Sequence, residues 1–114
     1  MAAMLPGTVV AAHLRASAAA LADGTTSVDT PAEFASVLTD VVAGQESVSA
    51  SLARLAEYVR DSPTLSEVPA EELAALTEVL LAAGRAAGYA AEALAQSRPM
   101  LRVILEVTGA DTHL

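Results

Sequence analysis

The chain has 114 residues, a formal net charge of −8 and 54% hydrophobic residues. That length suits one domain with a single core, so we expect one helical-bundle domain over residues 1–114. The negative charge argues against a nucleic-acid partner, because binding to phosphates depends on Lys and Arg, and against docking on anionic membranes. Since there is no cysteine, disulfides and thiolate metal sites are excluded.

The composition favours close helix packing over a core of large side chains. Only Phe34, Tyr58 and Tyr89 are aromatic, and aromatic side chains bury about 150–250 Å² each. A core of Leu, Val and Ala gains less per residue, so the helices must approach closely or share a core with a second copy. All six basic residues are Arg, and neither Lys nor Asn occurs, which indicates a GC-rich genome such as that of an actinobacterium.

The first predicted helix spans residues 8–22 and ends at Asp23-Gly24, since glycine readily adopts the left-handed cap. Its apolar residues recur at helical spacing: Val10, Leu14, Ala18 and Leu21. No basic segment precedes it, and His13 and Arg15 interrupt its apolar run, so it does not have the pattern of a signal peptide. We therefore expect a cytoplasmic protein with no membrane span.

The second predicted helix spans residues 31–61 and has the clearest start signal in the chain. Thr30 is suited to the N-cap, Pro31 to the first helical position, and Glu33 completes a capping box. An apolar seam follows at alternating spacings of four and three: Phe34, Leu38, Val41, Gln45, Val48, Leu52, Leu55 and Val59. The unbroken register favours one long helix, although a kink at Gly44 is possible.

The third predicted helix spans residues 69–97 and is apolar around most of its circumference. Its charges form one narrow stripe at seven-residue spacing: Glu71, Glu78, Arg85 and Glu92. A helix with so thin a polar face is typically buried on most sides, so we expect it at the centre of the bundle, with four core positions: Leu73, Leu80, Ala87 and Leu94. This helix and the preceding one form a long antiparallel hairpin in the predicted all-α fold, with shorter helices at both ends covering the alanine-rich helix.

The last segment, residues 99–108, has two interpretations. Leu101, Val103, Leu105 and Val107 alternate as in a strand, whereas Leu101, Ile104 and Leu105 share one face of a helix. A solitary strand has little to pair with in this chain, so we favour a helix that ends at Gly109.

Two clusters are candidates for interaction. Small residues in the third helix would let another backbone approach closely, either within the chain or at a subunit interface: Gly84, Ala87, Gly88 and Ala91. An acidic cluster is either a solubilising rim or a patch for a basic partner: Glu57, Asp61, Glu67, Glu71, Glu72 and Glu78.

Sequence motifs for catalysis are missing. His13 and His113 lie near opposite ends of the chain, and neither has a histidine or carboxylate three or four residues away to form a helical metal pair. No nucleophile elbow or phosphate-binding glycine loop occurs. Ser47, Ser49 and Ser51 are interpreted as polar-face residues. We therefore expect no enzyme activity, no metal and no cofactor.

The stretch from Gly44 to Leu55 resembles the turn and recognition helix of a helix-turn-helix regulator. Its glycine lies about two residues too close to the Ser-Val-Ser that follows, and Gln45 replaces an apolar residue. No basic side chain occupies positions 47–53, where DNA contacts would fall.

The acidic helical hairpin resembles the secreted WXG100 family in architecture. The turn between residues 61 and 69 contains no Trp-x-Gly, and Tyr58 and Tyr89 lack an acidic residue four positions later. These departures leave that family as an alternative to our main expectation, which is a non-enzymatic interaction or scaffolding module. The excess apolar surface of the third helix supports a homodimer that forms a larger bundle.

Overall fold

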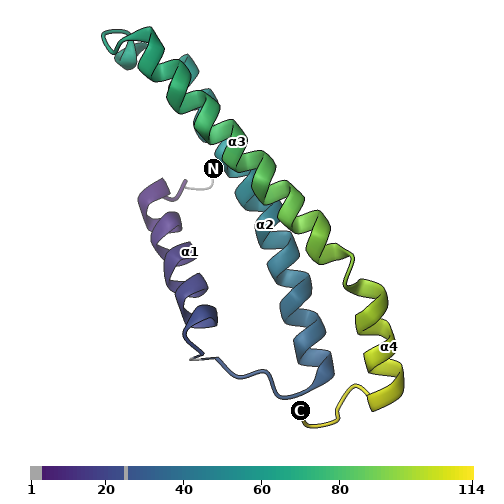
Figure 1. Cartoon of the computed structure of the whole chain (residues 1–114). Coiled ribbons are helices and arrows are strands. Elements are labelled where there is room, and N and C mark those ends of the chain that lie inside the picture. Colours follow the sequence, from purple (N-terminus) through teal and green to yellow (C-terminus); the bar gives the residue numbers. More distant parts are fainter. Residues whose placement is uncertain (1–3, 25) are drawn as a thin grey trace.

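The computed structural model describes residues 4–24 and 26–114 (Figure 1). Over these residues the chain is all-α, as the sequence predicted. It contains α1 (Gly7–Ala22), α2 (Pro31–Asp61), a short 3₁₀ turn η1 (Pro63–Leu65), α3 (Ala70–Ala95) and α4 (Arg98–Thr108).

α2 begins where local chemistry stabilises a helix start. The Thr30 hydroxyl accepts a hydrogen bond from the Glu33 backbone N–H at 3.2 Å, and the Glu33 carboxylate accepts one from the Asp29 N–H at 3.0 Å. The helix then continues across Gly44 to Asp61. Because no turn interrupts it, the helix-turn-helix interpretation of residues 44–55 is wrong.

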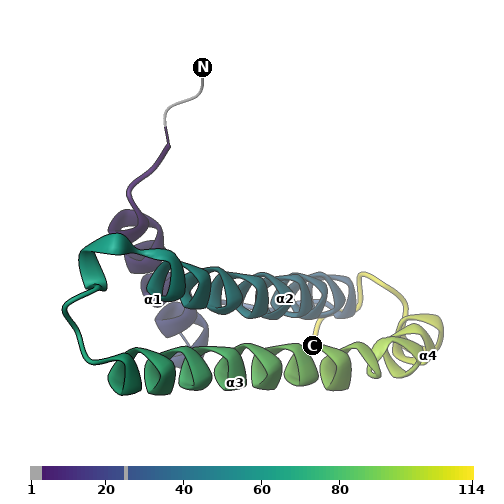
Figure 2. The ribbon, with the colours of Figure 1, turned by 90° about the horizontal axis from the view of Figure 1, so that it is seen from above.

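α2 and α3 lie side by side and run in opposite directions (Figures 1 and 2). Residues 62–69 reverse the chain, with Pro63 opening η1 after the last residue of α2. The two helices together form the long body of the molecule, whose principal extents are 60 × 32 × 29 Å.

α4 settles the ambiguity of the last segment, because residues 98–108 are helical. It packs against the start of α2, where Leu101 is buried and lines a small hollow with Pro31 and Phe34. The C-terminal tail returns to the same place: the Leu114 N–H donates to the Asp29 carbonyl at 2.7 Å.

α3 is covered along one side only, which corrects the expectation that it is central within the chain. Gly84 and Ala91 are buried, whereas Leu76, Val79 and Tyr89 are exposed. The four expected core positions are half-buried: Leu73, Leu80, Ala87 and Leu94. The end helices do not cover α3 as predicted, because α4 packs on α2 and α1 faces α2 across a groove.

The described part of the chain has very little core. Its buried hydrophobic residues are Val42, Ala56, Ala91 and Leu101. The radius of gyration is 18.7 Å, whereas a compact domain of this length has about 13 Å. The fold is therefore open and extended, with much apolar surface in contact with water.

Within residues 4–24 and 26–114, no helix combines the length and the hydropathy that crossing a membrane requires.

Candidate functional site

α2 and α3 come close together where Gly84 on α3 meets Ser49 on α2. The Ser49 hydroxyl donates a hydrogen bond to the Gly84 carbonyl oxygen at 2.7 Å. A Cβ atom added at Gly84 would lie 3.2 Å from the Ser49 carbonyl oxygen and 3.5 Å from the Leu52 Cβ. A side chain at this position would therefore make a tight contact with the α2 backbone, and glycine lets the two backbones approach.

The small residues predicted as an interface differ in their burial. Gly84 and Ala91 are buried, whereas Ala87 and Gly88 are half-buried. A Cβ at Gly88 would also meet Ser49, at 3.3 Å from its hydroxyl oxygen. For both glycines, the neighbour is thus α2 of the same chain.

The face of α2 that meets α3 coincides only in part with the predicted seam, since Leu52 of that seam lies against Gly84 beside Ser49. Since Ser49 contacts α3, residues seven positions away point the same way, and Val42 and Ala56 are indeed buried. We call Val42, Ser49 and Ala56 the contact row. The hydrophobic pattern does not reveal this row, because Ser49 interrupts it and was assigned to the polar face.

A second row of α2 lies beside the contact row and faces α1. This groove row consists of Val41, Val48 and Leu55, which belong to the predicted seam. The two valines are half-buried, and Leu55 keeps 48% of its surface exposed. α2 therefore carries an apolar face wide enough for two neighbours, of which α3 occupies one half.

α1 forms the other wall of this groove. Two adjoining pockets of about 580 and 490 Å³ lie between α1 and α2, and both are lined by Leu14 and Val48. Half of the surface of Val10, Leu14 and Leu21 remains exposed (50%, 54% and 49%). The apolar faces of the two helices thus point towards one groove without closing it.

The acidic cluster lies around the turn that joins α2 to α3, and all six of its side chains are exposed: Glu57, Asp61, Glu67, Glu71, Glu72 and Glu78. Two ion pairs occur there, Arg54 with Glu57 at 4.0 Å and Arg60 with Asp61 at 3.3 Å. Exposed pairs of this kind contribute little to stability.

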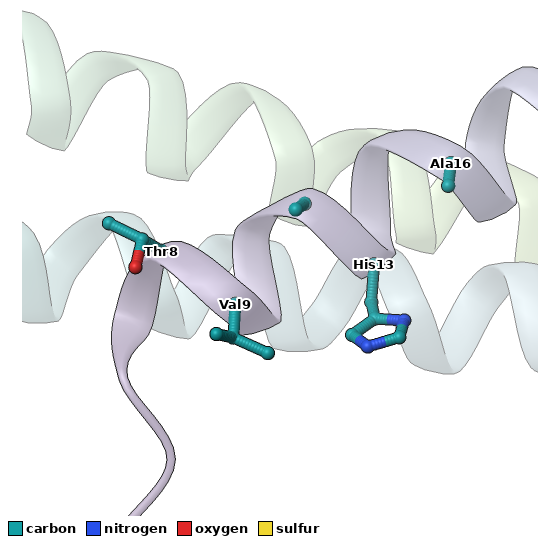
Figure 3. A pocket seen from close by; sticks show the side chains of 5 residues that line it. Thr8, Val9, His13 and Ala16 are labelled. Carbon is teal, nitrogen blue, oxygen red and sulfur yellow. The ribbon is translucent and has the colours of Figure 1, made fainter.

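The two histidines are not brought together. His13 projects with Thr8, Val9 and Ala16 from the face of α1 that points away from the groove, around a shallow hollow formed by α1 alone (Figure 3). The His113 ring nitrogen lies 2.8 Å from the Leu114 carbonyl oxygen at the other end of the chain. Among the described residues, no group of His, Asp and Glu side chains is arranged to hold a metal ion.

Comparisons with models of known protein families, with curated proteins and with solved structures give no match.

Proposed function

We propose that this chain is a non-enzymatic helical interaction module that completes its core by forming a homodimer and thereby acts as a small scaffold. The observation that carries the proposal is the surplus of apolar surface. Large hydrophobic side chains are exposed on all four helices, among them Leu14, Leu55, Val79 and Val107. Some of them line one continuous hollow between α1 and α2, and monomeric proteins rarely expose large contiguous apolar patches.

The amount of surplus accessible surface supports association with a second copy of the chain. The accessible surface is 8485 Å², about 2,700 Å² more than the roughly 5,800 Å² typical of a compact 11.5 kDa monomer. If each of two copies removed half of this surplus, the pair would bury about 2,700 Å², inside the roughly 2,000–5,000 Å² range of obligate homodimers. A homodimer therefore accounts for accessible surface that a single chain leaves exposed to solvent.

In the proposed assembly, α2 and α3 form a long antiparallel hairpin, and the shorter α1 and α4 flank it. Two such chains together make the helical bundle that a single chain does not complete. The charge of −8 favours a protein surface over nucleic acid or an anionic membrane as the partner.

Sedimentation over a range of micromolar concentrations tests this proposal. We expect a mass twice that of the chain, with dissociation to monomer only on strong dilution. A monomer at every concentration would refute the proposed function. An association through exposed hydrophobic side chains should also persist at high salt, whereas an association through the acidic cluster would weaken as salt is raised.

A further inference from the structure

The α1–α2 groove is a broad apolar hollow formed by two adjoining pockets. Its α2 wall is the groove row, and its α1 wall presents Val10, Leu14 and Leu21. Only two charged side chains, Asp40 and Arg54, line it. An occupant that removes this surface from water must therefore be apolar on the side it presents.

The shape of the groove matches one helix of this chain. α1 has 16 residues, a length of about 24 Å, and the stretch of α2 from Val37 to Leu55 that lines the groove measures about 28 Å. Leu14 lies at the middle of α1, and Val48 lies close to the middle of that stretch. A copy of α1 placed in the groove brings these two centres together whichever way it runs.

The net charges of the helices favour the α1–α2 groove over the exposed apolar face of α3 as the contact between two copies. α1 carries Arg15 and no carboxylate, a net charge of +1, whereas α2 has five carboxylates and two arginines, a net charge of −3. α3 has four carboxylates and Arg85, also −3. Pairing two α3 helices would bring like charges together, whereas α1 against α2 brings opposite charges together.

We propose that α1 of a second copy lies in the groove between α1 and α2, and that the exchange is reciprocal. An isologous dimer of this kind packs α1 and α2 of both copies into a four-helix core, with the α3 helices outside. The inference rests on the proposed homodimer, and it names the surface through which the two copies meet.

Sedimentation of three charge variants tests the surface. We expect Leu14→Glu and Val48→Glu to weaken dimerisation by roughly a hundredfold or more, because each would bury an unpaired carboxylate at the centre of the core. Val79→Glu is the matched control, since it adds the same charge at a position on the outer face of α3 that is 63% exposed. Circular dichroism establishes that each variant keeps its helix content.

Cysteine cross-linking distinguishes exchange between copies from closure of α1 onto its own chain. The protein has no cysteine, so no native thiol competes with the introduced ones, and the size tag separates mixed dimers from dimers of two like chains. We mix chains carrying Leu14→Cys with size-tagged chains carrying Val48→Cys, oxidise them and separate them under non-reducing conditions. The expected product is a tagged–untagged dimer, whereas a mixture of Val79→Cys with Val48→Cys yields none.

Each other outcome overturns the inference in a distinct way. If Val79→Glu dissociates the dimer and Leu14→Glu does not, the copies meet through α3, and the homodimer survives without the groove. If no mixed dimer forms and a Leu14→Cys/Val48→Cys chain links only within itself, the groove is closed by the chain's own α1. If the unsubstituted protein is a monomer, the proposed function falls as well.

Discussion

α2 meets α3 and α1 in two different ways. Towards α3 it presents Val42, Ser49 and Ala56, and the small Ser49 side chain lets the backbones come together at Gly84. Towards α1 it presents Val41, Val48 and Leu55, aliphatic side chains that line an open groove. Close packing of α2 on α3 therefore occurs along the contact row. The groove row, which has the stronger hydrophobic pattern, stays open to a further neighbour.

The largest effect is expected from filling the tight contact. Gly84→Leu places a side chain where a Cβ alone would lie 3.2 Å from the Ser49 carbonyl oxygen. A backbone atom cannot rotate away, so α3 must move off α2. We expect a loss of about 3 kcal/mol in the free energy of unfolding, measured by urea denaturation at one fixed protein concentration.

Gly44→Ala is the control for this substitution. Gly44 also lies within a long helix, but a Cβ there meets nothing within 4 Å. Alanine should therefore stabilise the protein by up to about 1 kcal/mol through its higher helix propensity. Equal effects of the two substitutions would show that α3 is not held against α2 at Gly84.

A smaller effect is expected when two neighbouring valines are replaced by alanine, one facing α3 and the other facing the groove. Val42 is 4% exposed in the contact with α3, whereas Val41 lines the groove. We expect Val42→Ala to cost about 2 kcal/mol at any protein concentration, since it leaves a cavity within the chain.

Val41→Ala should behave differently. In a dilute monomer its cost is small, and it should grow with protein concentration as the groove becomes occupied. Thermal melts of both variants at a low and a high concentration measure this difference. A concentration-independent cost for Val41→Ala would contradict occupation of the groove by a second copy.

The sequence predicted where the helices begin and end more successfully than which helices pack together, because helix ends depend on local chemistry. The Thr30 cap, the Gly24 stop and the break at Pro63 act within a few residues of themselves. The positive φ of Gly109, +82°, likewise ends α4. Each of these signals can be recognised in the sequence without knowing what the helix packs against.

The assignment of faces depended on information that a hydrophobic pattern does not carry. The apolar face of α2 spans two adjacent rows, and periodicity favoured the row with larger side chains over the one containing Ser49. The expected burial of α3 failed in a related way: its apolar circumference was apparent, but whether α1, α4 or a second copy covers it is a question of tertiary structure. The role of Ser49 had one sequence signal, its position opposite a glycine-containing stripe in the next helix.

The smallest predicted effect concerns the single hydrogen bond at the contact. Ser49→Ala removes the hydroxyl that donates to the Gly84 carbonyl at 2.7 Å while keeping the side chain small. We expect a loss of about 1 kcal/mol in the free energy of unfolding. Ser51→Ala is the matched control, because the Ser51 hydroxyl donates to the Ser47 carbonyl of its own helix and is exposed. That change should be neutral or slightly stabilising, since such bonds within a helix add little. If both alanine variants unfold alike in urea, the hydrogen bond to Gly84 does not contribute to holding α3 on α2, and the contact depends on close backbone packing alone.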